Sequence, residues 1–364
     1  MGNSPTLNAP AAAAHGIIHY FTANAWIDGR ATEQLSTTAR LPGMDRVAGY
    51  PDLHPGRYGP VGAAFLADRI YPQLIGNDIG CGMSLFALDL PARKLSISKA
   101  ARRLRGLEGP WSEAPDVRGD GFGSIGGGNH FCEVQAIDAA SDQARILGLE
   151  RGGLCLLVHS GSRGLGEAVF RSVIGTPSLD PDSDAGLNYV REHDLAVEWA
   201  SANRAAIACR AARALNTDLR LVSDAPHNIL TREGGLWLHR KGAAIADAGP
   251  VPLAGSRDSF SYLLAPTGSV QSPFKSLAHG AGRKHDRSSM HGRIRKVQSE
   301  LMALTRTGFG GLVLCEDPDL LIEEAGSAYK SARSVADDLE KLGLSETIAT
   351  LKPLITYKKT IERT

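Results

Sequence analysis

Six side chains that can bind a metal or attack a phosphorus atom lie in short segments rich in glycine and other small residues. These side chains are Asp78, Cys81, His130, His159, His227 and His279. Small neighbours let the backbone bend so that the first two point into one space. A carboxylate, a thiolate and imidazoles together suit manganese or zinc, whereas calcium and magnesium prefer oxygen ligands alone. By itself, the Asp-x-x-Cys spacing is more typical of a buried cysteine after a tight turn.

The segments around His130 and His159 combine a histidine with features that suit phosphate. Three glycines, Gly126 to Gly128, precede Asn129 and His130, and free backbone amides there can hold phosphate oxygens. No Gly-Lys-Ser/Thr follows, so this is not a Walker loop, and a glycine-rich hairpin with an incidental histidine is the alternative. The apolar run Leu154 to His159 predicts a buried strand that ends at the histidine, followed by a Ser/Arg/Gly loop.

His227 and His279 complete the set. His227 precedes Asn228 after a turn fixed by proline, and Arg283 follows His279 by four positions. A histidine ring nitrogen can attack a phosphoryl group, and an arginine can neutralise the charge that develops. A further metal ligand or a hydrogen-bonded loop histidine is the alternative for His279. Together the segments predict a metal-dependent nucleotidyl-transfer site.

In their order along the chain, these segments resemble those of the RtcB family of GTP-dependent RNA ligases. The resemblance extends from about Asp45 to the last residues. It includes Pro51-Asp52-Leu53-His54-Pro55-Gly56, Gly255-Ser256, Ser261-Tyr262 and Ala328-Tyr329-Lys330. It implies an α+β fold of the RtcB type, in which one large domain surrounds a central dinuclear metal site.

The resemblance also implies two manganese ions bridged by the thiolate of Cys81. One ion would be held by Cys81, His159 and His227. The other would be held by Asp78, Cys81 and His130. A bridging thiolate reduces the repulsion between two cations, and two neighbouring cations can clamp a phosphate.

By the same resemblance, His279 is the residue that becomes covalently guanylylated. Glu133 is expected to accept hydrogen bonds from the guanine edge, Tyr329 to stack on the base and Lys358 to add a polar contact. The implied nucleotide-binding residues are Asn129, Glu133, His227, Asn228, Ala254, Gly255, Ser256, Arg257, Ser261, His279, Gly280, Ala281, Gly282, Tyr329 and Lys358.

The implied reaction begins when His279 attacks the α-phosphorus of GTP and pyrophosphate leaves. GMP then passes to an RNA 3′-phosphate, which arises by opening of a 2′,3′-cyclic phosphate. A 5′-hydroxyl of a second RNA attacks the activated end and releases GMP. The implied partners are broken tRNA or ribosomal RNA and an activator of the archease type. Two alternatives are a dinuclear metallohydrolase acting on phosphoesters and a non-catalytic RNA-binding protein on a ligase scaffold.

Several positions near the implied nucleotide pocket depart from the family pattern. Arg257-Asp258-Ser259 stands where the family has Met-Gly-Thr, and Ala254 replaces a proline. Lys284-His285-Asp286 stands where the family has Val-Met-Ser, and Lys358-Lys359 where it has Lys-Gly. None of these changes removes a predicted metal ligand or the histidine nucleophile. They indicate a divergent bacterial branch with an altered pocket rim, and they leave its nucleotide preference open.

Composition fits a soluble enzyme. The 364-residue chain is 43% hydrophobic with a net charge of +1, and it has neither an apolar stretch of membrane-spanning length nor a secretory signal. Its five cysteines are an odd number without paired spacing, which favours a reducing cytoplasm. Because the predicted ligands extend from Asp78 to His279, we expect one domain over residues 1–364, with a flexible segment at 1–15. A monomer is the default state.

Three clusters of basic residues are candidates for contact with RNA. Those at Arg102 to Arg105 and Arg204 to Arg213 are expected to be solvated helix faces. The third, Arg283 to Lys296, adjoins the predicted nucleophile and is the better candidate for binding RNA phosphates. The predicted RNA-binding residues are Arg163, Arg283, Lys284 and Arg287.

The expected secondary structure is mixed. Short apolar or alternating segments predict strands at Gly16–Thr22, Met83–Leu88, Leu154–His159, Leu219–Ser223 and Leu236–His239. Helical periodicity is clearest at residues 187–215 and weaker at 96–107, 291–304 and 318–342, the last interrupted at Gly326. Because strands and helices do not alternate as regular βαβ units, the predicted fold class is α+β.

Overall fold

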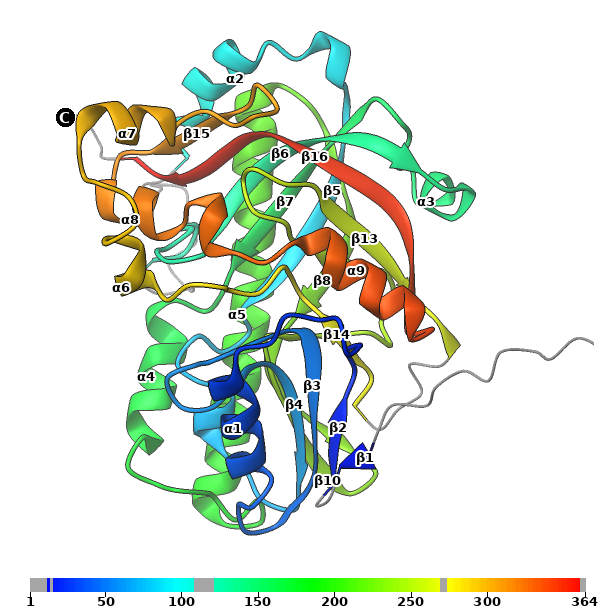
Figure 1. The fold of residues 1–364 in the computed structure, drawn as a ribbon, viewed down its shortest axis with the longest axis vertical. Coiled ribbons are helices and arrows are strands. Elements are labelled where there is room, and N and C mark those ends of the chain that lie inside the picture. The colour runs from blue at the N-terminus through cyan, green and yellow to red at the C-terminus, as the bar shows by residue number, and fades with distance from the viewer. Residues whose placement is uncertain (1–11, 14–15, 108–120, 269–273, 361–364) are drawn as a thin grey trace, which may run out of the picture.

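The structure, a computed structural model, describes residues 12–13, 16–107, 121–268 and 274–360 of the chain. Apart from positions 12 and 13, the segment predicted to be a flexible N-terminus lies outside the described residues. Two large sheets follow one another along the long axis of the molecule, with helices packed around them (Figure 1). This mixed architecture confirms the predicted α+β class, while the extent of the domain stays a prediction.

One large sheet is built mainly from the N-terminal part of the chain. Its strands, in pairing order, are β1 (Ala12–Ala13), β2 (Ile17–His19), β3 (Met44–His54), β4 (Val61–Ala67), β10 (Leu236–Lys241) and β9 (Asn228–Glu233). Helix α1 (Gly29–Thr38) packs on this sheet, because its apolar residues Ala31 and Leu35 share a core cluster with Val47 and Phe65.

The other large sheet carries most of the predicted metal ligands at its edge. Its strands, in pairing order, are β12 (Val251–Leu253), β13 (Ser261–Pro266), β16 (Ser345–Lys359), β6 (Phe131–Ala140), β7 (Gly153–Ser160), β5 (Gly82–Pro91) and β8 (Leu219–Pro226). Strand β15 (Leu312–Cys315) pairs in parallel with β16. A separate two-stranded sheet pairs β11 (Ala243–Ile245) with β14 (Ser276–Ala278) in antiparallel fashion.

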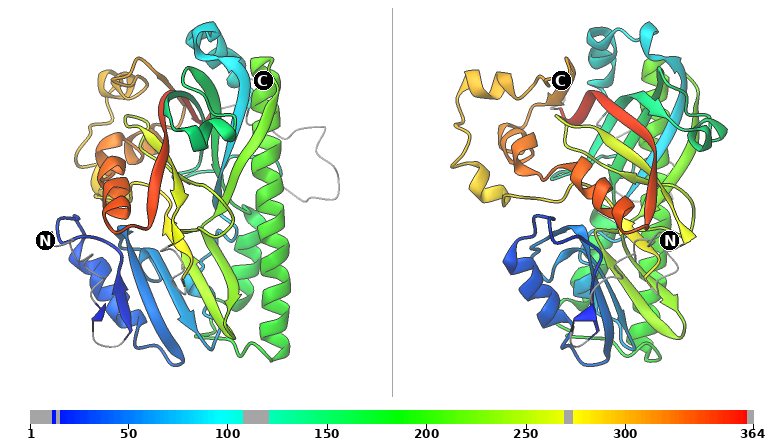
Figure 2. Two further views of the ribbon diagram at one scale, coloured as in Figure 1. Left: turned by 90° about the vertical axis from the view of Figure 1, so that its right-hand side faces the viewer. Right: turned by 45° about the vertical axis from the view of Figure 1, so that its right-hand side comes forward.

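The long helix α5 (Asp184–Leu215) runs along the molecule and is clearest in the left view of Figure 2. The side chain of Ser183 caps its first turn, and Asn216 ends it in the left-handed conformation. Its apolar face packs on the second sheet. The other helical segments are η1 (Pro72–Leu74), η2 (Ala92–Lys94), α2 (Ile97–Leu104), α3 (Asp142–Ile146), α4 (Gly164–Val173), α6 (Arg287–Met290), α7 (Gln298–Ala303), α8 (Pro318–Glu323), η5 (Gly326–Ala328) and α9 (Ala332–Lys341).

All five predicted strand segments contain strands, namely β2, β5, β7, β8 and β10. The predicted helices at 187–215, 96–107 and 318–342 correspond to α5, α2 and the pair α8 and α9, which are separated near Gly326 as expected. The helix predicted at 291–304 is wrong in its first half, since α7 begins at Gln298. Gly292, a poor helix former, lies in the non-helical part.

Strand β16 was not predicted, although it is 15 residues long and central to the second sheet. Its interior contains Pro353, which has no backbone N–H and normally excludes a central strand. The structure accommodates the proline at an irregularity, because the pairing of β16 with β6 shifts between Pro353 and Ile355.

The solvated helix face expected around Arg204 is wrong for that residue, whose side chain is fully buried on α5. Its Nη2 lies 2.8 Å and 3.0 Å from the two carboxylate oxygens of Asp224 on β8. Its Nη1 donates to the carbonyl oxygens of Gly80 and Ser160, at 2.8 Å and 3.0 Å. Each of these two residues adjoins a predicted metal ligand, so one buried cation ties two ligand segments to α5.

Replacing Arg204 with Met is expected to lower the free energy of unfolding by about 3–5 kcal/mol, because Asp224 loses its buried partner cation. Urea unfolding followed by circular dichroism measures this change. Arg191→Met is the matched control on the same helix, since that side chain is 68% exposed, and its effect should stay below about 0.5 kcal/mol. Equal stabilities of the two variants would contradict the anchoring role.

Candidate metal and nucleotide-transfer site

The predicted histidine and cysteine ligands meet at one edge of the second sheet. Strands β6, β7, β5 and β8 are consecutive and antiparallel, so this edge collects the starts of β5 and β6 and the ends of β7 and β8. The residues at or next to these ends are Cys81 (β5), His130 (β6), His159 (β7) and His227 (β8). Antiparallel pairing therefore brings together segments that lie far apart in the sequence.

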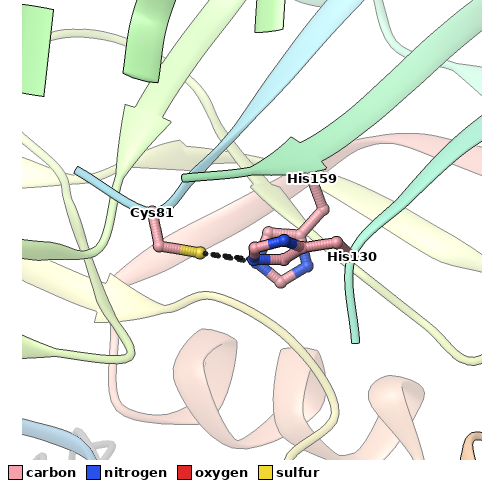
Figure 3. Close-up of side chains that lie close together, drawn as sticks. All are labelled: Cys81, His130 and His159. Atoms are coloured by element: carbon pink, nitrogen blue, oxygen red, sulfur yellow. Dashed lines mark hydrogen bonds between the residues drawn. The ribbon is translucent and has the colours of Figure 1, made fainter. Parts of the chain in front are cut away.

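Cys81, His130 and His159 form a compact buried cluster at this edge (Figure 3). The Sγ of Cys81 lies 3.3 Å from Nε2 of His130 and 3.2 Å from Nε2 of His159. Nε2 of His227 lies 3.3 Å from Nε2 of His159. A carboxylate oxygen of Asp78 lies 2.9 Å from Nε2 of His130. Three of the five predicted ligands thus form one compact group, and Asp78 and His227 each adjoin one of its histidines.

Backbone carbonyl groups orient two of the imidazole rings. Nδ1 of His130 lies 3.1 Å from the carbonyl oxygen of Ile125, and Nδ1 of His159 lies 3.2 Å from that of Asn129. When each Nδ1–H donates to its carbonyl, each Nε2 presents a lone pair to the sulfur of Cys81. Histidines that bind metals have this arrangement, in which the outer nitrogen is fixed by a hydrogen bond.

Burial sets the protonation of the cluster. It lowers the pKa of His159 and His227 well below the usual value, so both are neutral at pH 7, the form that binds a metal. Burial also raises the pKa of the Cys81 thiol, and neighbouring Asp78 raises it further. Burial by itself would raise the pKa of Asp78, but His130, Cys81 and Arg163 together outweigh it and lower that pKa. A nearby cation is therefore needed to convert this thiol to a thiolate.

The donor set fits a divalent transition metal. It offers a sulfur, imidazole nitrogens and one carboxylate, a mixture that manganese or zinc accepts more readily than calcium. Gly161 keeps space for the carboxylate, because a Cβ there would lie 2.1 Å from an oxygen of Asp78. Nδ1 of His227 is buried and has no hydrogen-bond partner among the described residues.

His279 faces the cluster from different elements. It follows β14, and its ring centroid lies 4.3 Å from that of His227 and 6.5 Å from that of His159. Its Nδ1 lies 2.7 Å from the carbonyl oxygen of Gly242 and 2.8 Å from Oδ2 of Asp52. The Nδ1–H donates to these oxygens, so Nε2 keeps a lone pair.

Asp52 is a site residue to which the sequence assigned no role, although its segment was part of the family resemblance. It lies near the end of β3, its side chain is fully buried, and it also accepts a hydrogen bond from the backbone N–H of His279 at 3.3 Å. Gly282 lets the backbone that follows His279 lie close to Asp52. Its φ is +72°, and a Cβ there would lie 2.3 Å from the carbonyl oxygen of Asp52.

A cavity of about 1000 Å³ connects the donor cluster, His279 and most of the predicted nucleotide-binding residues. The predicted site residues on its wall are Asp78, Cys81, Asn129, Glu133, His159, His227, Asn228, Ala254, Gly255, Ser256, Arg257, His279, Gly280, Ala281, Gly282, Arg283, Arg287, Tyr329 and Lys358. Ser261 lies behind this wall, where its hydroxyl oxygen accepts hydrogen bonds from Gln135 and from the backbone of Gly255 at 3.0 Å each.

Glu133 and Lys358 form a polar part of the cavity wall. The carboxylate of Glu133 accepts hydrogen bonds from Gln135, at 2.6 Å, and from the hydroxyl of Thr356. Burial raises the pKa of Glu133 to about 7 even though these bonds and Lys358 oppose the shift. Burial also lowers the pKa of Lys358. The wall therefore offers a hydrogen-bond acceptor and a donor to a polar ligand.

Glu324 is a second residue that the sequence did not identify, and several predicted site residues converge on it. Its Oε1 lies 3.0 Å from Nη1 of Arg283 and 3.1 Å from Nε of Arg287. The hydroxyl of Tyr329 donates to its other oxygen, and Nζ of Lys358 lies 3.9 Å away. The guanidinium of Arg283 also lies 5.0 Å from the ring centroid of Tyr329. A single buried carboxylate thus offsets part of the charge of the two arginines.

The remaining basic residues differ in their surroundings. Lys284 is exposed and lies outside the cavity wall. The guanidinium of Arg163 lies over Gly126, where a Cβ would come within 2.2 Å of it. Arg257 is 5% exposed, donates to the carbonyl oxygen of Leu321 at 3.0 Å, and has a pKa lowered by burial. Where the family pattern has methionine, this chain therefore has a buried cation.

A family model described as tRNA-splicing ligase RtcB matches residues 34–108 and 111–359. The chain belongs to the RtcB family. It is 44% identical over 356 residues to the RNA-splicing ligase RtcB2 of Escherichia coli, which covers 92% of this chain and 93% of that relative. It is 27% identical over 439 residues to the tRNA-splicing ligase RtcB of Thermococcus kodakarensis, covering 89% and 90% of the two chains. The RNA-splicing ligase RtcB of Mycobacterium bovis is 28% identical over 434 residues, covering 88% and 99%.

These findings confirm the predicted RtcB family and the predicted class of enzyme, an RNA ligase. The buried Cys/His group is consistent with the metal site expected for an RtcB protein. In the parts of the chain that the structure describes, no helix has the length and apolar character needed to cross a membrane.

Cys81→Ala is expected to weaken manganese binding by at least about 100-fold, because the sulfur lies at the centre of the donor cluster. Isothermal titration calorimetry with manganese measures the affinity. Cys209→Ala is the matched control, since Cys209 is an exposed cysteine on α5, and it should bind manganese as the unmodified protein does. Unchanged affinity in Cys81→Ala would show that the cluster is not the metal site.

Proposed function

We propose that this RNA ligase uses GTP to join an RNA 2′,3′-cyclic phosphate or 3′-phosphate end to an RNA 5′-hydroxyl end. The observation that carries the proposal is the setting of His279. Its ring is fixed through Nδ1 by Asp52 and Gly242, and it lies 4.3 Å from the ring of His227 in a cavity of about 1000 Å³. A fixed nucleophile thus adjoins a donor cluster suited to divalent metals.

His279 acts first, as the nucleophile. Its Nε2 lone pair forms a bond to the α-phosphorus of GTP, while the bond from that phosphorus to the bridging oxygen breaks and pyrophosphate leaves. In the tautomer whose proton lies on Nδ1, facing Asp52 and Gly242, Nε2 has no proton to be removed. The carboxylate of Asp52 stabilises the positive charge that the ring gains on attack.

The proposed cofactor is a pair of manganese ions, with the ligands that the family resemblance implies. Cys81, His159 and His227 hold one ion, and Asp78, Cys81 and His130 hold the other. When bound, the ions stabilise the negative charge of phosphate and pyrophosphate oxygens. The chain itself keeps the ligands in place, through the carbonyl groups that fix two imidazoles and through the buried cation on α5.

The nucleotide is GTP, with its base at the polar wall formed by Glu133 and Lys358. Guanine has N1–H and N2–H groups that donate to a carboxylate, and an O6 that accepts from an ammonium group. Asn129, Asn228, Ser256 and their neighbours on the cavity wall hold the rest of the nucleotide. Tyr329 contacts the base with a ring that Arg283 and Glu324 hold in place.

The later steps transfer GMP to RNA and then release it. An oxygen of the RNA 3′-phosphate attacks the phosphorus on His279, the N–P bond breaks, and the neutral imidazole is restored. The 5′-hydroxyl of the second RNA then attacks the RNA phosphorus, loses its proton to solvent and displaces GMP. A 2′,3′-cyclic phosphate is first opened by water to the 3′-phosphate. Each step exchanges one bond at phosphorus for another, so no redox cofactor is required.

The proposed partners follow from this chemistry. The RNA substrates are broken tRNA or ribosomal RNA, and an archease-type protein assists turnover. We place the protein in the cytoplasm, because all five cysteines are free and the buried thiol of Cys81 must stay reduced to bind metal. The functional unit is a monomer formed by one domain.

The direct test of function is a joining assay with two labelled RNA oligonucleotides, one ending in a 2′,3′-cyclic phosphate and one beginning with a 5′-hydroxyl. Joined product is expected with manganese and GTP, and none when manganese is removed by a chelator. Release of the terminal phosphate as inorganic phosphate, with no joined product, would contradict the proposal and favour the alternative metallohydrolase.

His279→Ala is expected to abolish joining of these oligonucleotides while manganese binding survives, because the nucleophile is lost but the donor cluster is intact. The same variant should still join an RNA whose 3′ end carries a preformed pyrophosphate link to guanosine, since that step needs no nucleophile from the protein. Gel electrophoresis measures both reactions. The control is His291→Ala, whose partly exposed ring lies outside the cavity wall. Normal joining by His279→Ala would refute the assignment.

Guanosine affinity is expected to increase as the pH rises from 6 to 8. Because the pKa of Glu133 is raised to about 7, its carboxyl group is mostly protonated at pH 6 and ionised at pH 8. The ionised form accepts both hydrogen bonds from guanine, so the dissociation constant should fall by up to about tenfold per pH unit below 7. Calorimetry with guanosine avoids titration of nucleotide phosphates. Glu133→Gln should bind more weakly at pH 8 and lose the pH dependence; a retained dependence would exclude Glu133.

A further inference from the structure

A second cavity, of about 300 Å³, adjoins the one that contains the proposed catalytic site. Arg57, Val61, Asn77 and Lys241 line both cavities. The rest of its wall comes from the loop between β3 and β4, from η1 and from α4. None of the predicted metal-binding, nucleotide-binding or catalytic residues lies on that remaining wall, so the proposed reaction assigns this cavity no role.

One side of the second cavity is a stack of planar side chains. The ring of Tyr58 is 5.4 Å from the ring of Phe170 on α4, tilted by 54°. The guanidinium carbon of Arg57 lies over Tyr58, 5.1 Å from the ring centroid. Phe170 is 4% exposed and Tyr58 is 39% exposed, so the stack begins in the core and ends at the surface. Arg57, which is also exposed, covers the ring of Tyr58.

The wall of the second cavity is also positively charged. Its charged residues are Arg57, Arg171, Lys241 and Glu167. Glu167 is paired with Arg171 at 2.7 Å, which leaves two positive charges. Nζ of Lys241 donates to the carbonyl oxygen of Ile75 at 2.7 Å, and the acidic group nearby is Asp78, a predicted metal ligand in the first cavity. Arg57 is exposed, and within the described parts of the chain it has no acidic partner.

These features match the way proteins bind unpaired nucleotides. Bases that are not in a duplex stack on aromatic rings or on the plane of a guanidinium group, and nearby cations contact the phosphates. Lys241 lines both cavities. An RNA strand whose reacting phosphate lies in the first cavity would therefore pass the ammonium group of Lys241 where it continues into the second cavity. A small apolar ligand has no need of the two cations.

We propose that the second cavity binds one unpaired nucleotide of the RNA substrate close to the reacting end, with its base on Arg57 and its phosphate at Lys241. This inference rests on the proposed function, since it assigns a place to the RNA strand that the reaction requires. Stacking tolerates any base, so the cavity selects for an unpaired nucleotide rather than for a sequence. Ends in broken loops are therefore better substrates than ends buried in a duplex.

The test pairs protein variants with RNA that lacks a single base. Joining rates are measured with oligonucleotides in which each of the first three nucleotides on either side of the junction is, in turn, abasic. For the unmodified protein, one abasic position should raise KM by about tenfold or more. If the sensitive abasic position lies in the RNA that ends in the 3′-phosphate, that RNA occupies the cavity; if it lies in the RNA that begins with the 5′-hydroxyl, the other RNA does.

Tyr58→Ala and Arg57→Lys should raise KM for intact RNA by a similar factor and become insensitive to the same abasic position, because base and stack act through one contact. Arg57→Lys keeps the charge and loses the planar group, so it separates stacking from electrostatics. Tyr58→Phe should behave as the unmodified protein. Trp26→Ala is the matched control, since Trp26 is 48% exposed beside Lys330 but lines neither cavity.

Transfer of GMP to the protein in the absence of RNA provides a separate readout, and Tyr58→Ala should leave it unchanged. If the unmodified protein accepts no GMP, the proposed function fails, and fluorescence anisotropy with the same intact and abasic RNAs still tests the cavity by binding alone. Abasic sensitivity that persists unchanged in both Tyr58→Ala and Arg57→Lys overturns the inference. So does equal joining of RNA by Tyr58→Ala and Trp26→Ala.

Discussion

The site depends on the burial of the Cys81 thiol among imidazole rings at one edge of the larger sheet. Burial opposes ionisation of this thiol and raises its pKa, while it keeps His159 and His227 neutral. A bound divalent cation reverses the balance, because it stabilises a thiolate and uses the imidazole lone pairs. The antiparallel strands and the buried Arg204 enforce this arrangement.

The proposed nucleophile, His279, is held by other strands than those that carry the predicted metal ligands. Its orientation therefore does not depend on metal binding. His279 follows β14, and its anchors are Asp52 at the end of β3 and the carbonyl group of Gly242 after β10. Loss of the donor cluster and loss of the nucleophile therefore have different consequences. In the proposed reaction, the first removes charge stabilisation at phosphate, and the second removes the covalent step alone.

The sequence was sufficient to identify those site residues whose neighbours in the chain form a recognisable pattern. His159 ends an apolar run, and the strand predicted there is β7. The turn predicted before His227 is wrong, because Pro226 is the last residue of β8. Asp52 and Glu324 were missed because their roles arise from tertiary contacts with residues 227 and 41 positions away. Arg204 was misjudged because a basic run on a helix gives no sign of the one arginine that turns inward. Strand β16 was missed because its proline contradicts a central strand.

The most direct test of the account is to incubate the purified protein with manganese and GTP labelled at the α-phosphate, without RNA. Intact-mass analysis and peptide mapping then locate any adduct. The account predicts one added GMP, labile to acid as a phosphoramidate is, on the peptide that contains His279. An adduct on another residue, or no adduct on folded protein with manganese bound, would contradict it.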